Sequence, residues 1–314
     1  MRPDDSRPAD SPRPSDLPHP EHWHRTEDLD RFLDRAGDFL RSRPAAHTVM
    51  LSVTEAVRRR GPGAYGDEPP VYGVLERDGA VRATYLQTPP HQLQVTALTT
   101  EEADSLAAHL AGLGRVVPGV GGEHETAAAF AAAWQTRTGA TTTIRHCQRV
   151  YRLGTLTVPE LAPAGRARIA STSDRTQLAK WYEEFTEAVG LPGIDRDSWA
   201  DARIAYGGAT FWEAPDGAPV AMAGVTPQIA GQVRVAPVYT PAELRGRGYA
   251  GAVTAEVSRA ARDAGADEVL LFTDLANPTS NALYQRIGYR PVSDFAVYDF
   301  VAGAEFAAGA DFAK

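Results

Sequence analysis

Along the first half of the chain, some segments have apolar positions at the period of a helix and others at the period of a strand. This mixture indicates an α+β fold. Asp78-Gly79 between two alternating runs indicates a tight hairpin, because both residues tolerate the positive φ angles of such turns. In chain order we expect a helix capped by Thr26, a helix over 47–60, strands over 71–77, 81–87 and 93–97, a helix over 101–113, a strand over 116–120, a helix over 124–138 and a strand over 141–153.

The second half repeats this order, with Asp216-Gly217 as its hairpin signal. We expect a strand over 166–170, a helix from an Asp174 cap to Val189, a helix over 197–206, strands over 210–214, 219–225 and 232–240, a helix over 249–264, a strand over 268–274, a helix over 278–287, and strands over 291–294 and 296–301. The shared order suggests a tandem duplication.

Proline-containing segments indicate where the domains of the chain begin and end. Residues 1–25 are rich in Pro, Asp, Arg and Ser, a composition that buries no core, so we expect a disordered tail. We expect a first domain over 26–157, a proline-containing linker over 158–164, a second domain over 165–302 and a C-terminal tail over 303–314.

Composition limits the function classes. The net charge of −8 argues against a nucleic-acid partner, because such proteins present basic surfaces. No apolar run reaches the ~18 residues of a membrane helix, and no secretory signal begins the chain. We therefore expect a cytoplasmic protein, monomeric or homodimeric, without a membrane partner. Cys147 is the only cysteine, so a cysteine-based zinc site is excluded, and we expect no metal.

A glycine-containing turn stands between an apolar strand and an amphipathic helix. Its residues are Arg245, Gly246, Arg247, Gly248, Tyr249 and Ala250. Such a turn leaves backbone N–H groups unpaired at the positive end of a helix dipole, which is the geometry of an anion site. The corresponding part of the first half, Leu98-Thr99-Thr100-Glu101-Glu102, has acids in place of glycines. The sequence therefore predicts a phosphate site in the second half.

A second motif follows about 30 residues later, with Asn277, Ser280, Leu283, Tyr284, Gly288 and Tyr289 at its fixed positions. Together with Arg245, Gly248 and Ala250, it resembles the GNAT superfamily of acyl-CoA-dependent N-acyltransferases over residues 165–302. The resemblance implies two tandem αβα-layered domains. Each would have a mixed, mostly antiparallel sheet, a splayed central strand pair and flanking helices, and the first domain would be a degenerate copy.

The resemblance also implies a place for acetyl-CoA. Amides of the residue 245–250 turn would hold the pyrophosphate, with Arg245 and Arg247 adding charge. The strand ending at Val238, Tyr239 and Thr240 would splay from the strand over 271–273, and pantetheine would fill the gap. An N–H near Val238 or Tyr239 would polarise the thioester carbonyl. The remaining residues expected to bind the cofactor are Asn277, Ser280 and Asn281.

By the same resemblance, Tyr284 would protonate the departing thiolate, although a packed aromatic is the alternative reading. The general base is open, because residues 234–240 contain no acid. Asp274 and Glu184 are the candidates, with Glu183 and Glu187 beside the latter. Asp274 could instead hold its own loop, and a water relay could replace either carboxylate.

These features predict an acetyltransferase that moves an acetyl group from acetyl-CoA to an amine of a small-molecule acceptor by direct attack. The alternative is a non-catalytic acyl-CoA-binding sensor or regulatory module. The first half would then shape the acceptor pocket or support the second half.

Overall fold

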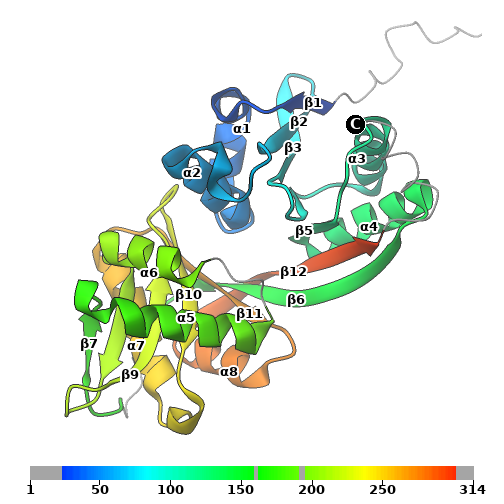
Figure 1. Ribbon diagram of the computed structural model, residues 1–314. Helices are drawn as coiled ribbons and strands as arrows, with labels where there is room; N and C mark the ends of the chain where they lie inside the picture. The colour runs from blue at the N-terminus through cyan, green and yellow to red at the C-terminus, as the bar shows by residue number, and fades with distance from the viewer. Residues whose placement is uncertain (1–22, 159–161, 191–194, 302–314) are drawn as a thin grey trace, which may run out of the picture.

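The computed structural model describes residues 23–158, 162–190 and 195–301 (Figure 1). Its strands are β1 Trp23–Thr26, β2 Val71–Arg77, β3 Ala80–Gln87, β4 Leu93–Val95, β5 Gly119–Glu123, β6 Thr141–Leu153, β7 Arg166–Ile169, β8 Ala209–Glu213, β9 Pro219–Val225, β10 Gln232–Tyr239, β11 Glu268–Asp274 and β12 Tyr289–Val301. Its helices are α1 Leu29–Ser42, α2 Thr48–Arg60, α3 Thr100–Gly112, α4 His124–Thr138, α5 Arg175–Val189, α6 Arg196–Ala205, α7 Tyr249–Asp263 and α8 Pro278–Arg286.

All of these strands form one mixed sheet in the order β1-β2-β3-β4-β5-β12-β6-β11-β10-β9-β8-β7. Two neighbouring pairs, β4–β5 and β10–β11, are parallel, and the other pairs are antiparallel. The parallel pairs occupy equivalent places in the two halves, which confirms the expected repeat of a mostly antiparallel sheet. We call β1–β5 with α1–α4 the first lobe, and β7–β11 with α5–α8 the second lobe.

The two lobes exchange their last strands. β12, from the end of the chain, lies between β5 and β6, and β6, from the first half, lies between β12 and β11. Both strands are 13 residues long and run side by side between the lobes (Figure 1). The cores follow the exchange, because Ala296 is buried in the first lobe whereas Tyr151 and Leu153 are buried in the second. The division at the linker therefore separates the sequence but not the sheet.

Each lobe packs helices on both faces of its sheet, which confirms the αβα layering. Alternate residues of β2 face opposite sides, so Leu75 packs with α3 and α4 while Tyr72 packs with α1 and α2. In the second lobe, Val233 and Val235 pack with α7 and α8, while Phe211 packs with α5 and α6.

The first lobe also touches the second directly. The Thr48 hydroxyl of α2 donates to Gln232 Oε1 of β10 at 3.0 Å, and Ile229 and Ala230, in the β9–β10 connection, pack against the α1 and α2 core. Gln232 and Arg234 lie on the face of β10 opposite to Val233, which is the face of α5 and α6. Helix α2 therefore reaches that same face of the second lobe.

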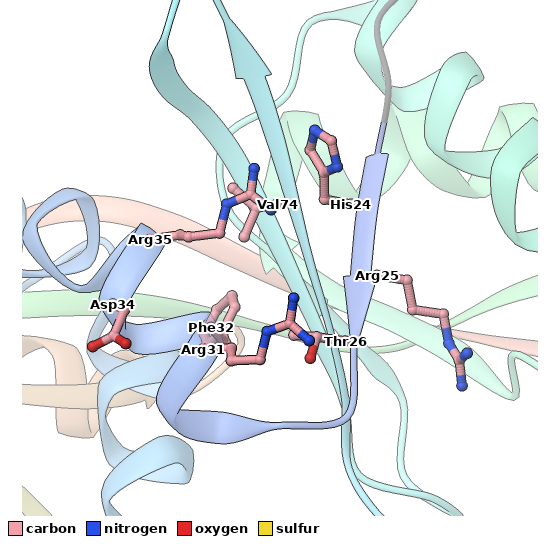
Figure 2. Close-up of a pocket in the computed structure, with 8 residues that line it drawn as sticks. All are labelled: His24, Arg25, Thr26, Arg31, Phe32, Asp34, Arg35 and Val74. Carbon is pink, nitrogen blue, oxygen red and sulfur yellow. The ribbon is translucent and has the colours of Figure 1, made fainter.

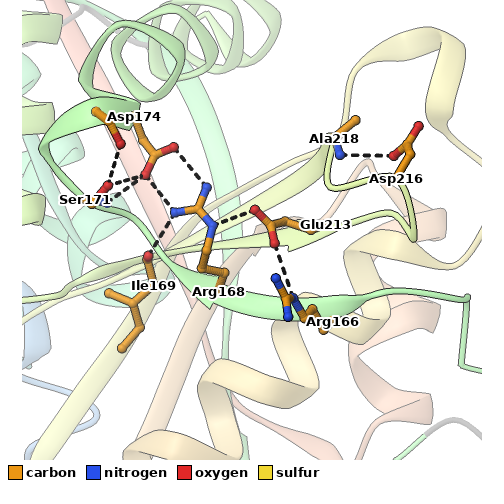
Figure 3. Close-up of polar contacts among 9 residues, drawn as sticks. Arg166, Arg168, Ile169, Ser171, Asp174, Glu213, Asp216 and Ala218 are labelled. Carbon is orange, nitrogen blue, oxygen red and sulfur yellow. Dashed lines mark hydrogen bonds and ion pairs between the residues drawn. The ribbon is translucent and has the colours of Figure 1, made fainter.

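The start of α5 is fixed by a charged network (Figure 3). Arg168 of β7 donates to both oxygens of Asp174, at 2.7 and 2.9 Å, and to Glu213 Oε1 of β8 at 2.5 Å. Asp174 Oδ2 also accepts from the Ser171 amide at 2.8 Å. Asp174 was expected to cap α5, but its side chain caps the short turn before the helix and ties that turn to the sheet.

The N-terminal boundary was wrong by a few residues. Residues 23–25, expected in the tail, belong to β1, because Trp23 is buried against Tyr85 and β1 pairs with β2. Thr26 ends this strand, and Asp28 caps α1 instead by accepting from the amides of residues 30 and 31. The remainder of the expected tails, residues 1–22 and 303–314, and linker residues 159–161 lie outside the described part.

The expected strand over 116–120 was also misplaced. Val116 is 68% exposed, whereas the strand runs over Gly119–Glu123 and includes three glycines. These glycines let neighbouring groups approach closely, since a Cβ at Gly119 would lie 2.1 Å from the Tyr298 carbonyl oxygen. Residues 291–301 form one strand with two register shifts rather than two separate strands.

Candidate functional site

The glycine turn before α7 presents unpaired amides. Within the part of the chain that the structure describes, the amides of Gly246, Arg247, Gly248, Tyr249 and Ala250 donate to no oxygen atom. Gly246 and Gly248 have φ angles of 77° and 85°, which only glycine adopts without strain. The turn is exposed and continues into a 15-residue helix. Five free donors at a helix N-terminus have the geometry that phosphate groups require, and the phosphate site stays a prediction.

Two arginines brace this turn. Arg245 Nε donates to the Thr240 carbonyl oxygen at 3.0 Å, and Arg247 Nη2 donates to the Glu243 carbonyl oxygen at 3.2 Å. Each guanidinium keeps further N–H groups for a ligand, because arginine carries five donors. These side chains thus fix the turn and place positive charge beside its amides.

The central strand pair diverges next to this turn. β10 and β11 pair from Gln232↔Glu268 to Val235↔Leu271, yet β10 continues to Tyr239 and β11 to Asp274. A register shift between Val235 and Val238 accompanies the divergence. The expected splay is therefore present. Among the described residues, no strand pairs with the inner side of the backbone beyond Val235 and Leu271, so an extended chain such as pantetheine can pair there.

Tyr284 lies on α8 among the core residues of the second lobe. Its side chain is 8% exposed and contacts Tyr289 edge to face at 6.1 Å between ring centroids. Its hydroxyl forms no hydrogen bond within the described residues. Burial raises the pKa of Tyr284 to about 12, so the phenol is protonated at neutral pH, as a proton donor must be.

A residue from the first half of the chain holds α8 in place. The Tyr151 hydroxyl of β6 donates to Asn281 Oδ1 at 2.8 Å and accepts from Gln285 Nε2 at 3.0 Å. Tyr284 lies between these two positions on the same helix. Sequence reasoning missed Tyr151 because β6 precedes the linker, and no residue pattern predicts that the lobes exchange strands.

The three polar residues at the start of α8 differ in their roles. Asn281 Nδ2 donates to the carbonyl oxygens of Asp274 and Asn277, at 2.8 and 2.7 Å, so its amide closes the β11–α8 loop. Asn277 Oδ1 caps α8 by accepting from the Ser280 amide at 3.0 Å, which leaves Asn277 Nδ2 available. Asn277 remains predicted to contact pantetheine and Ser280 to bind the cofactor, whereas the contacts of Asn281 are those of a positioning residue.

The two candidate bases lie in different surroundings. Asp274 Oδ1 accepts from the Ala276 amide at 2.7 Å, a turn contact that matches the alternative reading of that residue. Glu184 of α5 reaches the splayed strand, because its Oε2 accepts from the Tyr239 hydroxyl at 2.8 Å. Burial, followed by this bond, raises the pKa of Tyr239 to about 12. Glu184 is thus the carboxylate that the structure brings to the end of β10.

The first lobe offers no equivalent phosphate site at α3. Thr99 Oγ1 accepts from the Glu102 amide at 3.2 Å, and Glu102 Oε2 accepts from the Thr99 amide at 2.9 Å. These bonds use donors that a phosphate would need, and they add a negative charge. The Gln94 side chain also fills the space over Gly121, between β4 and β5.

A hollow in the surface lies away from this site. A hollow lined by His24, Arg25, Thr26, Arg31, Phe32, Asp34, Arg35 and Val74 lies beside β1, at the opposite edge of the sheet from the second lobe (Figure 2). Among the described residues, no group of three or more His, Cys, Asp or Glu side chains could hold a metal ion. In that same part of the chain, no helix is long and apolar enough to cross a membrane.

Comparisons with known proteins concern the second lobe and the overall fold. The family model "Acetyltransferase (GNAT) family" matches residues 175–289. No curated protein sequence matches the chain. Among solved structures, a GNAT-family acetyltransferase from Colwellia psychrerythraea is 12% identical, with a TM-score of 0.57 over 90% of this chain and 100% of that one.

Two further structures have the same fold. A GCN5-related N-acetyltransferase from Sphaerobacter thermophilus is 19% identical, with a TM-score of 0.55 over 84% of this chain and 94% of that one. A tandem GNAT protein from the clavulanic acid biosynthesis pathway is 13% identical, with a TM-score of 0.52 over 90% of this chain and 98% of that one. At these identities the likeness concerns the fold alone.

Proposed function

Because residues 175–289 form an acetyltransferase domain of the GNAT family, whose members transfer acyl groups from acyl-CoA, we propose that this protein acetylates an amine of a small-molecule acceptor with acetyl-CoA. The observation that carries the proposal is the conjunction of the unpaired 246–250 amides with the diverging β10–β11 pair. The amides suit a pyrophosphate, and the gap suits the extended pantetheine arm.

In this proposal the acyl group lies at the end of β10, near Val238 and Tyr239. A backbone N–H there polarises the thioester carbonyl, and the amine attacks the carbonyl carbon directly. The C–S bond then breaks, and the Tyr284 hydroxyl gives its proton to the departing thiolate. Support for Tyr284 comes from its free hydroxyl and its place on the helix that follows β11.

Glu184 is our choice for the base. An acceptor ammonium must lose a proton before it attacks, and the Glu184 carboxylate lies against Tyr239 at the open end of β10. The proton leaves either to Glu184 directly or through one water molecule. Asp274 keeps the lesser claim, because its bonded oxygen closes its own turn at Ala276, whereas Glu184 contacts the splayed strand itself.

The test is release of free CoA thiol from acetyl-CoA in the presence of a panel of amines. Turnover that depends on an amine, and that falls in Tyr284→Phe, supports the acetyltransferase. Tight binding of CoA without turnover of any amine would instead support the alternative, a non-catalytic acyl-CoA sensor.

A further inference from the structure

Two arginines in the second lobe lie among protein atoms without an acidic partner. Among the described residues, neither Arg203 of α6 nor Arg234 of β10 forms an ion pair with a carboxylate. Burial lowers the pKa of both side chains, and the positive charge of Arg234 helps to lower the pKa of Arg203 to about 10. Both side chains are partly buried, and charges withdrawn from water without counter-ions cost free energy, so their presence calls for a function.

The contacts of these arginines hold them without neutralising them. Arg203 Nη1 donates to the Val225 carbonyl oxygen at 2.8 Å and to the Tyr206 hydroxyl, and its guanidinium lies 5.3 Å from the Trp199 ring centre. Arg234 Nη1 is 3.5 Å from the Thr48 hydroxyl oxygen, and its guanidinium lies 5.8 Å from the ring centre of an aromatic residue on β11, Phe272.

Donors remain free on both side chains. Nη2 of Arg203, and Nε and Nη2 of Arg234, form no hydrogen bond within the described residues, and both side chains keep part of their surface accessible. Gln232 precedes Arg234 by two residues and so lies next to it on the same face of β10. Its Nε2 is buried without an acceptor. A set of donors without acceptors is what an anionic ligand would satisfy.

The first lobe contributes to the same region. Helix α2 brings Thr48 to Gln232 and Arg234. Tyr65, just after α2, lies close enough to Arg234 for each charge to affect the other's pKa, and the Arg60 guanidinium lies 5.4 Å from the Tyr65 ring centre. The positive charge therefore lies where the two lobes meet.

This region is on the acceptor side of the acyl site. Arg234 lies on the face of the sheet that carries α5 and α6, the same side from which Glu184 of α5 reaches Tyr239. Arg234 precedes Val238 by four residues. Because of the register shift between Val235 and Val238, these residues span about three regular strand steps, ~10 Å at ~3.3 Å per residue. An acceptor that reaches both Arg234 and the acyl site must therefore carry its reacting amine and its second polar group several bonds apart.

We propose that Arg203 and Arg234 bind an anionic group, a carboxylate or a phosphate, at the end of the acceptor remote from its reacting amine. The amine part of this statement rests on the proposed acetyltransferase function, whereas the anion site stands on the arginines and their contacts alone. The first lobe then completes the acceptor site through Thr48 and Tyr65.

Direct binding tests the anion site without turnover. The full chain is saturated with CoA, so that the 246–250 amides are occupied, and is titrated calorimetrically at low salt with inorganic phosphate and with glutarate. We expect at least one anion to bind, at least tenfold more weakly to Arg234→Gln and Arg203→Gln, and equally to the control Arg43→Gln, which changes an exposed arginine. Binding by neither anion, or binding undiminished in both variants, would overturn the proposal.

Stability separates this role from a structural one. Arg234→Gln removes a partly buried charge that has no counter-ion among the described residues, so its thermal midpoint should equal or exceed that of the parent. A marked drop in the midpoint, with anion binding lost only in proportion to unfolded protein, would show that Arg234 serves the fold and would contradict the proposal.

Turnover then separates the two proposals. The acceptors are ω-amino carboxylates of increasing chain length, the matching ω-amino amides, and an aminoalkyl phosphate paired with its alcohol. We expect kcat/KM to favour the anionic member of a pair at least tenfold in the parent and to lose that preference in Arg234→Gln. Anion binding without turnover of any amine would reject the acetyltransferase but keep the site. Turnover of an amine with no preference for the anionic member of a pair, and with no anion binding, would keep the acetyltransferase but reject the anion site.

Discussion

The Tyr239 hydroxyl of β10 lies 2.8 Å from a carboxylate oxygen of Glu184 on α5. Tyr239 stands beyond the point where β10 leaves β11, and Trp181 of the same helix packs beside its ring at 6.1 Å between centroids. The contact therefore joins the expected acyl end of the site to the helix that covers its acceptor side.

Replacement of Glu184 tests this carboxylate as the base. We expect Glu184→Gln to lower kcat about 100-fold near neutral pH, since general bases contribute ~10²–10⁴-fold. The KM for acetyl-CoA should change little, because the carboxylate lies on the acceptor side. Glu187→Gln is the matched control, since Glu187 lies on the same helix and is exposed. Equal loss in both variants, or full activity in Glu184→Gln, would count against the assignment.

Replacement of Tyr284 tests the proton donor. Tyr284→Phe should lower kcat about 100-fold or more while calorimetry shows unchanged CoA affinity. Because burial raises the pKa of Tyr284 to about 12, the phenol loses its proton only as the pH approaches that value. The parent kcat should therefore show no alkaline decline from this group up to about pH 10. Tyr298→Phe on β12, whose side chain packs against the first-lobe core, is the control and should retain activity.

A charged side chain in the glycine turn tests the phosphate site. Gly248 has a φ of 85°, so Gly248→Glu adds strain of ~1–2 kcal/mol and places a carboxylate among the free amides. We expect CoA affinity to fall at least 100-fold by calorimetry. Gly265→Glu, at a φ of 88° after the other end of α7, imposes similar strain away from the turn. CoA affinity that is unchanged in Gly248→Glu would exclude this turn as the cradle.

The strand exchange makes a prediction for Tyr151. Tyr151→Phe removes hydrogen bonds to Asn281 and Gln285 but leaves the ring in the core. We expect kcat to fall severalfold, with a loss of ~1 kcal/mol in unfolding free energy. Because α8 carries Tyr284, the loss should appear in kcat rather than in the KM for acetyl-CoA. An unchanged kcat in a destabilised variant would limit Tyr151 to a packing role.

Acid stability should report the Arg168–Asp174 network. Hydrogen bonds from Arg168 hold the pKa of Asp174 well below its ordinary value of 3.8. A depressed folded-state pKa gives stability that is present above about pH 4 and is lost as the pH falls through the folded value. Asp174→Asn should cost ~1.5–3 kcal/mol of unfolding free energy at pH 7. Chemical denaturation should show that cost shrinking below pH 4, and a cost independent of pH would contradict the linkage.

Much of the second half could be predicted from residue pattern and motif. The expected strands over 219–225 and 268–274 coincide with β9 and β11, and the glycine turn leads into α7 as expected. Periodicity succeeded there because apolar runs are long and are bounded by glycine, proline or aspartate. It failed at β1, where the burial of Trp23 against Tyr85 depends on a contact distant in sequence.

The candidate site divides in the same way. Motif residues led to the predicted phosphate turn, Tyr284 and Asn277, because the positions of these residues depend on local backbone. Tyr151 and Arg234 escaped notice, since the contact of Tyr151 with α8 depends on the strand exchange and that of Arg234 depends on the meeting of α2 with β10. The preference for Glu184 over Glu183 and Glu187 also depends on the structure, because three glutamates on one helix look alike in sequence.

The exchange of β6 and β12 has a consequence for how this protein is made. A growing chain leaves the ribosome from its N-terminus, and domains generally fold as they emerge. Here the sheet of the first lobe has a missing strand between β5 and β6 until residues 289–301 have been synthesised. The sheet of the first lobe therefore stays incomplete until nearly the whole chain has been synthesised. Arrested nascent chains that end before residue 289 should remain protease-sensitive in a lobe whose own residues emerged long before.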